Sequence, residues 1–414
     1  MKNSILLFFF LVSIFFVQAQ DEPIDLDSLE AVRMEAYKAK VTMQNEQRLL
    51  DFESLVKDSV KRVDLSGLEL NLLPDLSGFS QLRDLDLSEN DLKEFKEKEI
   101  SSTYLKELNL SGNTLEKLKF SKNDSIITLK LNECGLKKIP RSIKKLRGLK
   151  RLELDKNQIS KIPGFIRRMK SLEEINVSFN GIQLSKKDLK NCRNLKIIQF
   201  IGNDLVDLPE NMNVLTAARK LNFSQNQLQR LPQSMAELDS LETLIFYKNQ
   251  FEEIPQVVFD LTSLQELDFY YNSLPEIPAE ISKLRSLEVL FISYNQINVI
   301  PESLKDLKEL KKLYMHHNQL IGLPPWIVAF EKLEVLDVGF NKLAVLPDFS
   351  KATSLTEVDV QENNLSEVPW SILTLPKLER LFIKNNPYEV TAEEAIEFKR
   401  LVEELLDRGA RVSF

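Results

Sequence analysis

The sequence predicts an α/β solenoid of about fifteen coils, with a curved parallel sheet on its concave face and a helix at each end. Three observations support this prediction. Asparagine recurs along the chain, and most of the steps between successive asparagines are 23 residues. Each asparagine closes a block of the form LxxLxLxxNxL, such as "LKRLELDKNQI" at 149–159. Many blocks are followed by an apolar residue and a proline, as in "LPQSMAEL". A fixed period of this length is typical of repeat architectures.

The repeat can be followed through most of the chain. The recurring asparagines are Asn90, Asn113, Asn157, Asn180, Asn203, Asn226, Asn249, Asn272, Asn295, Asn318, Asn341, Asn363 and Asn386. Two degenerate coils carry Leu68 and Cys134 at the asparagine position. We therefore predict a solenoid over residues 60–386.

The residue pattern of one coil explains the predicted fold. The central xLxLx portion alternates with period two, as in a strand that buries one side and presents the other. Proline ends the strand, and the following segment returns the chain with two more apolar residues directed inward. One coil cannot bury these leucines alone, but stacked coils share a continuous core and a parallel sheet. The asparagine amide is expected to satisfy backbone groups where the chain leaves the strand.

The first residues predict export. The segment "MKNSILLFFFLVSIFFVQAQ" has Lys2, then an apolar run from Ile5 to Val17, and small residues before a cut after Ala19. The run is shorter than the roughly twenty residues that span a bilayer, so we interpret residues 1–19 as a secretory signal peptide. The mature chain is expected to be secreted or periplasmic, without a transmembrane segment.

Both ends of the solenoid are expected to carry helical caps, because an open end would expose leucines. Residues 20–59 contain apolar residues at helical spacing, which predicts an N-terminal helical cap. Residues 387–414 contain Thr391 with Glu394 three positions later, and Gly409 as a stop. This pattern predicts a C-terminal helical cap, followed by a short strand.

The repeat resembles the leucine-rich repeat family, in the 23-residue class LxxLxLxxNxLxxLPxxIxxLxx. The resemblance covers about 325 of the 414 residues. It implies a binding function, because the class includes receptors, scaffolds and adhesins. Some family members carry a ligase or kinase domain, but here only about 28 residues follow the last coil. We therefore expect no enzyme activity and no cofactor.

A binding site must use the variable positions that packing leaves free on the sheet. In coils 9–13 these positions become aromatic, and five of the eight tyrosines and both histidines of the chain fall there. The predicted ligand-binding residues are Ile245, Tyr247, Tyr270, Tyr271, Phe291, Tyr294, Tyr314, His316, His317 and Phe340.

Two interpretations of these aromatic residues remain open. Residues directly before the asparagine, such as Tyr271 and Tyr294, are expected to stack on their equivalents in neighbouring coils. The outward strand residues have no such structural reason, so they favour recognition of a protein, a peptide or a glycan. Nearby Asp268, Asp337 and Asp359 favour a ligand with positive or hydroxyl-rich character.

Catalysis and metal binding are disfavoured. Ser293, His316 and Asp337 fall on neighbouring strands, but the backbone amides of a sheet are committed to pairing and leave no oxyanion hole. His316 and His317 are adjacent in a strand-like segment, where successive side chains point to opposite sides, and no cysteine is near. We therefore predict neither catalytic residues nor a metal site.

A basic band supports a second hypothesis, that of a structural or adhesive surface protein anchored through coils 4–6. Residues 137–193 hold seventeen Lys or Arg against five Asp or Glu, which gives +12 in a chain of −7 overall. Such a band favours docking to an anionic surface, and an ordinary solvated face is the alternative. Nucleic acid is not expected as a partner of an exported protein. The anionic-surface candidates are Lys144, Lys145, Arg147, Arg167, Arg168, Lys186, Lys187 and Lys190.

Overall fold

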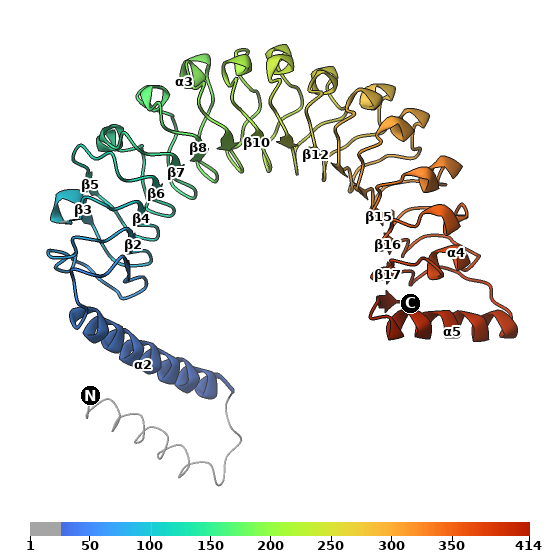
Figure 1. Ribbon diagram of the computed structural model, residues 1–414, viewed down its shortest axis with the longest axis horizontal. Coiled ribbons are helices and arrows are strands. Elements are labelled where there is room, and N and C mark those ends of the chain that lie inside the picture. Colours follow the sequence, from blue (N-terminus) through green and yellow to red (C-terminus); the bar gives the residue numbers. More distant parts are fainter. Residues whose placement is uncertain (1–25, 101) are drawn as a thin grey trace, which may run out of the picture. The chain divides into compact units, whose positions relative to one another are not determined.

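A computed structural model describes residues 26–100 and 102–414 (Figure 1). The predicted signal peptide at 1–19 lies outside these described residues. None of the described helices is long and apolar enough to cross a membrane. The chain divides into two compact units, Met1–Cys134 (unit 1) and Gly135–Phe414 (unit 2).

Short parallel strands, one per coil, build the main sheet in each unit. In unit 1 they are β1 (Arg62–Asp64), β2 (Asp84–Asp86), β4 (Glu107–Asn109) and β6 (Thr128–Lys130). In unit 2 they are β7 (Arg151–Glu153), β8 (Glu174–Asn176), β9 (Ile197–Gln199), β10 (Lys220–Asn222), β11 (Thr243–Ile245), β12 (Glu266–Asp268), β13 (Val289–Phe291), β14 (Lys312–Tyr314), β15 (Val335–Asp337), β16 (Glu357–Asp359), β17 (Arg380–Phe382) and β18 (Arg411–Ser413). Each pairs with the next in sequence, as stacked coils require.

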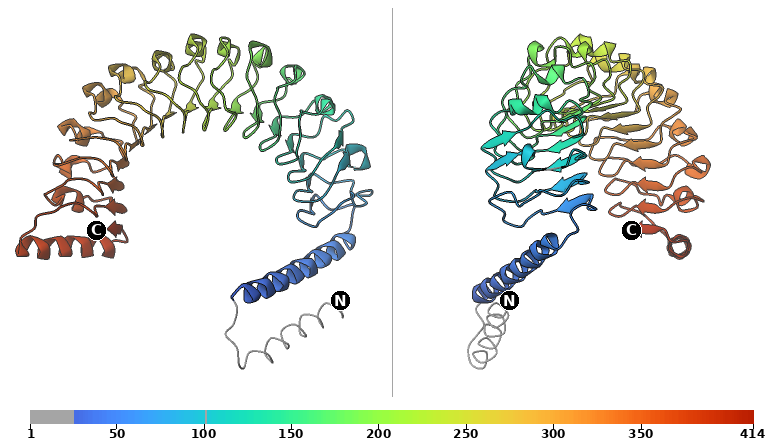
Figure 2. Two further views of the ribbon diagram at one scale, coloured as in Figure 1. Left: turned by 180° about the vertical axis from the view of Figure 1, so that it is seen from behind. Right: turned by 60° about the vertical axis from the view of Figure 1, so that its left-hand side comes forward.

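The return segments form short helices on the side opposite the sheet, as Figures 1 and 2 show for unit 2. They are η2 (Arg141–Lys145), η3 (Ile166–Arg168), α3 (Lys186–Leu189), η4 (Met212–Val214), η5 (Gln233–Glu237), η6 (Gln256–Asp260), η7 (Ala279–Lys283), η8 (Glu302–Asp306), η9 (Pro325–Ala329), η10 (Phe349–Lys351) and α4 (Trp370–Leu373). In unit 1 the returns instead contain a second parallel pair, β3 (Glu94–Lys96) with β5 (Lys117–Lys119), and η1 (Glu97–Glu99). Proline starts several returns because its fixed φ suits the extended residue before a helical turn, as at Pro232.

The core lies between sheet and returns. The middle residue of each main-sheet strand from β1 to β17 is buried, for example Leu244 and Leu290. In coils 7–10 a row of buried phenylalanines stacks from coil to coil, with ring centroids 5.2–5.9 Å apart. The row consists of Phe200, Phe223, Phe246 and Phe269. Aromatic stacking of this kind adds to the burial of leucines and stabilises the coil-to-coil contact.

The repeated asparagines satisfy backbone groups at the turns, as predicted, and they also form a hydrogen-bonded ladder between coils. The Asn295 side-chain N–H donates to the carbonyls of Phe269 and Ile292 at 3.0 and 3.1 Å. Its side-chain oxygen accepts from the Leu274 backbone N–H at 2.9 Å. One amide therefore joins two coils and satisfies the buried backbone at the turn.

Helices flank the coils at both ends. α2 (Leu26–Glu53) is largely exposed, and near its end Phe52 stacks on Phe79 at 5.4 Å. α5 (Ala392–Asp407) begins with the predicted capping box between Thr391 and Glu394 and buries three apolar residues. β18 then pairs with β17. The two helices lie where the sequence predicts them, and their function as caps stays a prediction.

Candidate binding surface

The predicted ligand-binding residues form three rows along the sheet of unit 2. Pairing of β11 to β16 aligns the third residue of each strand, which gives a central row. The central row is Ile245, Asp268, Phe291, Tyr314, Asp337 and Asp359. The second row, two positions later, includes Tyr247, Tyr270, Ser293 and His316. The rim row, one position further, includes Tyr271, Tyr294, His317 and Phe340. We call these rows the concave surface.

The rim row is a continuous aromatic stack. Ring centroids are 4.1 Å apart for Tyr271 and Tyr294, 3.9 Å for Tyr294 and His317, and 4.1 Å for His317 and Phe340. All four residues have positive φ, between 52° and 59°, because the chain turns out of the strand here. The rim rings therefore stack on their equivalents, as one of the two interpretations expects.

The second row joins the rim. The Tyr270 ring lies 5.4 Å from Tyr247, 5.5 Å from His316 and 5.3 Å from the rim residue Tyr294. Burial raises the pKa of Tyr270 to about 12, so its hydroxyl stays protonated at neutral pH. The cluster thus presents aromatic faces together with hydroxyl groups that can donate hydrogen bonds.

The central row places two aromatic rings between acidic side chains. Phe291 and Tyr314 stack at 4.6 Å with an interplanar angle of 6°, and both are half-buried. Asp268 precedes this pair in the register and Asp337 follows it. Ile245, at the start of the row, is only 9% exposed, so it offers little contact area to a ligand.

Burial perturbs the acids of the central row. It raises the pKa of Asp268 and of Asp337 to about 7, and that of Asp359 to about 6. Backbone N–H groups two residues later oppose this shift by donating to each carboxylate, at 2.7 Å for Asp268 and 3.0 Å for Asp359. Desolvation is the larger effect, so these acids are partly neutral near pH 7.

The two histidines meet on the same side of the chain, which corrects the prediction that they point apart. Their Nδ1 atoms are 2.8 Å apart, because the positive φ of His317 ends the strand alternation. His316 Nε2 also lies 3.8 Å from a carboxylate oxygen of Asp337. Opposite charges would attract here, but burial lowers the pKa of His316 to about 4 while raising that of Asp337. Both groups are therefore neutral between about pH 4 and pH 7.

The alternative chemistries find no support in this geometry. Ser293 is fully buried, and its hydroxyl has no hydrogen-bond partner, so a substrate cannot reach it as a nucleophile. Among the described residues no group of three or more His, Cys, Asp or Glu could hold a metal ion.

The basic band lies on the return segments of unit 2. Its predicted contact residues are mostly exposed: Lys144 and Lys145 in η2 with Arg147 after it, Arg167 and Arg168 in η3, Lys186 and Lys187 in α3 with Lys190 after it. The sequence predictions omitted Arg141, Phe165, Met169 and Lys170, which line a cavity beside these residues. Comparison of the returns position by position offers a signal, because Phe165 stands where four other returns have serine.

Comparisons with known proteins give a consistent result. The leucine rich repeat family profile matches residues 240–297 and 276–320, and a second leucine rich repeat profile matches residues 101–118. No curated protein matches the chain in sequence.

Solved structures match over most of the chain. A Leptospira interrogans LRR protein is 26% identical, with a TM-score of 0.72, and the match covers 87% of this chain and 97% of that one. The plant peptide hormone receptor RGFR1, in complex with RGF2, is 26% identical, with a TM-score of 0.58 over 75% of this chain and 52% of the receptor. An internalin of Listeria monocytogenes is 18% identical, with a TM-score of 0.59 over 89% and 94%. These matches, together with one parallel strand per coil and the asparagine ladder, identify the chain as a leucine-rich repeat protein.

Proposed function

We propose that this protein is an exported, non-enzymatic binding module that recognises a protein or peptide through the concave surface of coils 9–13. The main observation in support is a set of half-buried aromatic side chains that point away from the leucine core, namely Tyr247, Tyr270, Phe291 and Tyr314. Packing of the coils does not require aromatic residues at these positions, because polar residues occupy all of them in coils 1–8 except for Ile201 in coil 7. Large, rigid aromatic side chains are typical anchors of binding energy.

The dimensions of the concave surface suit an extended peptide. Four steps between paired strands, at about 4.8 Å each, give a patch about 19 Å long. An extended peptide spans it with about six residues at roughly 3.3 Å each. Among the structural neighbours, the plant receptor is described as a peptide hormone receptor and was solved in complex with RGF2.

The central row also favours a particular ligand chemistry. Stacked Phe291 and Tyr314 offer ring faces to a cation, and Asp268 and Asp337 lie on either side of them in the register. Burial disfavours the ionised form of these carboxylates. A lysine or arginine of the ligand would stabilise that form by its positive charge. A peptide with a basic residue therefore fits the surface better than a neutral glycan does.

The decisive experiment replaces Tyr247, Tyr270, Phe291 and Tyr314 together by serine. Immobilised wild-type and variant proteins are incubated with the native extracellular medium, and retained proteins are identified by mass spectrometry. We expect a partner that the wild type retains and the variant loses, while circular dichroism and melting temperature show a folded variant.

A matched control removes apolar surface elsewhere on the same coils. Val299, Ile321 and Val345 are exposed beyond the asparagine turns, and their combined replacement by serine should leave partner retention unchanged. Equal loss in both variants would indicate non-specific adsorption and contradict the proposal. The adhesive function of the basic band would be favoured by a different pair of results. The aromatic variant would still retain the partner, and replacing Lys144, Lys145 and Arg147 by glutamine would abolish retention.

A further inference from the structure

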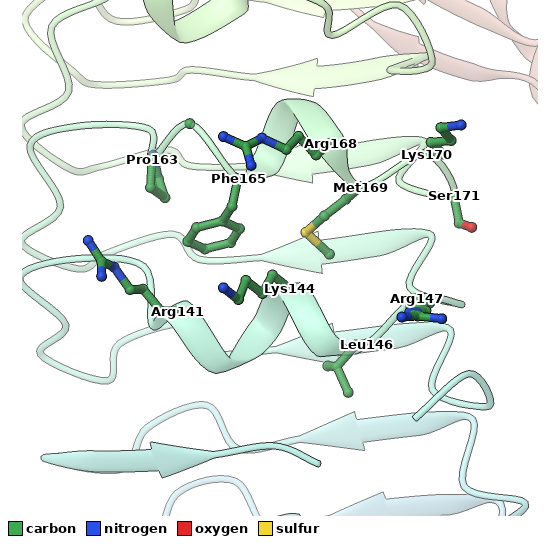
Figure 3. A pocket seen from close by; sticks show the side chains of 11 residues that line it. Arg141, Lys144, Leu146, Arg147, Pro163, Phe165, Arg168, Met169, Lys170 and Ser171 are labelled. Atoms are coloured by element: carbon green, nitrogen blue, oxygen red, sulfur yellow. The ribbon is translucent and has the colours of Figure 1, made fainter. Parts of the chain in front are cut away.

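A cavity of about 630 Å³ lies between the return segments of two neighbouring coils in the basic band. One wall comes from η2 and the residues after it, and the other comes from the η3 segment (Figure 3). It lies on the return side of unit 2, whereas the concave surface lies on the sheet.

Five cationic residues line this cavity: Arg141, Lys144, Arg147, Arg168 and Lys170. All five are exposed, and among residues 26–100 and 102–414 no carboxylate oxygen lies within 4.0 Å of their side-chain nitrogens. The positive charge at the cavity is therefore not neutralised from within the described chain.

Nearby acids of the basic band are engaged elsewhere. Glu173 pairs with Lys196 at 2.9 Å and with Lys150 at 3.7 Å, and Glu174 pairs with Arg151. Asp188 accepts hydrogen bonds from Ser185 in the capping box of α3. The acids thus contribute to coil-to-coil pairs and to a helix start, while the cavity keeps an excess of positive charge.

The middle of the cavity is apolar. Phe165 and Met169 are half-buried and point from the η3 segment into the space beside η2, as Figure 3 shows. The position of Phe165 is occupied by serine in four other proline-led returns, namely Ser142, Ser234, Ser303 and Ser371, and by Trp326 in another. The solenoid therefore does not require an aromatic residue here, and a flat apolar face has been placed among cations.

Cationic residues lie along the whole cavity and surround its apolar residues. In Figure 3, Arg141 lies at one end and Arg147 with Lys170 lies at the other, while Lys144 and Arg168 flank Phe165 and Met169 in the middle. The five residues of η2 follow this direction, a length of about 10 Å at roughly 2.0 Å per residue. An anionic phospholipid has one charged end and a long apolar end, so it matches this order poorly.

We propose that this cavity binds an acidic oligosaccharide, with sulfate or carboxylate groups at both ends and the C–H face of a sugar ring on Phe165. Arginine and lysine donate charge-assisted hydrogen bonds to such anions. Single-stranded nucleic acid also combines anionic groups with flat rings, but its binding sites usually carry successive aromatic residues. Phe165 is the one aromatic residue among those that line the cavity.

The test is isothermal titration calorimetry with a fully sulfated, heparin-derived tetrasaccharide. Replacing Arg141 and Lys170 by glutamine should weaken binding at least about tenfold, since each loses charge-assisted hydrogen bonds. Phe165→Ser keeps the charge and should weaken binding about fivefold through the lost ring contact. The matched control, Lys186→Gln with Lys187→Gln, removes two charges from the same band outside the cavity and should change affinity less than about twofold.

Three results would overturn the proposal. Equal weakening by the two double variants would mean diffuse attraction to the whole band. Unchanged affinity of Phe165→Ser would remove the sugar-ring contact; if that variant does not fold, Phe165→Leu, which keeps apolar volume without a flat face, replaces it. The third result concerns two other probes, phosphatidylglycerol vesicles and a ten-nucleotide deoxythymidine oligomer. If either binds more tightly than the tetrasaccharide does, and its binding depends on Phe165, the cavity is assigned to lipid or to nucleic acid.

Discussion

The buried carboxylate of Asp337 should make the stability of the central row depend on pH. Its side chain is 17% exposed, and burial raises its pKa from an ordinary 3.8 to about 7. The folded state therefore holds a proton that the unfolded state releases between pH 3.8 and pH 7. Stability from this group is present at low pH and falls as the pH rises through that window.

The magnitude follows from the two pKa values. Relative to strongly acidic solution, the group reduces the free energy of unfolding by about 2 kcal/mol at pH 5 and about 4 kcal/mol at pH 8. Asp337→Asn has no such proton equilibrium and keeps the shape of the neutral acid. We therefore expect the stability of the variant, relative to wild type, to increase by about 2–3 kcal/mol between pH 5 and pH 8.

Urea unfolding of both proteins at pH 5, 6.5 and 8 measures this difference. Neighbouring His316 and Asp359 titrate in both proteins, so most of their contribution cancels in the comparison. Asp306→Asn, at an exposed position of η8, is the matched control and should give curves parallel to wild type. Parallel curves for Asp337→Asn as well, or a carboxyl carbon resonance of Asp337 that titrates below pH 5, would refute the reasoning.

Two further changes test the packing beneath the concave surface. Asn318→Ala should lower the free energy of unfolding by about 1–3 kcal/mol, because it leaves the buried Ile297 N–H without a partner. The Ile292 and Met315 carbonyls each lose one amide donor but still accept from Asn295 and Asn341. Asn318→Ser, measured by the same urea titration, should recover part of the loss. Gly339→Ala should cost about 1–3 kcal/mol, because the added methyl group would lie 2.6 Å from a carboxylate oxygen of Asp359. Gly322→Ala, with open space around the new methyl group, should stay within about 0.5 kcal/mol in the same assay, and equal effects at the two glycines would contradict the steric argument.

The sequence was sufficient for features that repeat. Period-two alternation around each leucine predicted one strand per coil, and the recurring asparagines predicted that their amides satisfy the backbone at each turn, because both features recur in every coil. The capping box of α5 was also predictable, since Thr391 and Glu394 interact over three residues. Local rules were enough in these cases.

Features that depart from the repeating pattern were not predictable. His316 and His317 meet because the chain enters a left-handed turn at His317, where strand alternation no longer holds. Ile245 follows the alternation yet is nearly covered. The cavity at Phe165 combines residues from two returns, and the periodic pattern describes only what the returns have in common.

The acids of the central row favour a role in ligand recognition over a purely structural role at the turn. Asn109, Asn176 and Asn222 occupy the same strand position in earlier coils, and each accepts a hydrogen bond from the backbone N–H two residues later. Asp268 and Asp359 make the equivalent bond with a carboxylate, although burial disfavours its charge.

A neutral amide would therefore serve the turn as well and at lower cost in stability. Residues that reduce stability without a structural need are typical of functional sites. A basic group of a ligand would offset the desolvation of these carboxylates and lower their pKa values, so binding should release protons near pH 7. Replacing Asp268, Asp337 and Asp359 by asparagine should then give a more stable protein that binds its partner less tightly. Replacement of purely structural acids would not produce this combination.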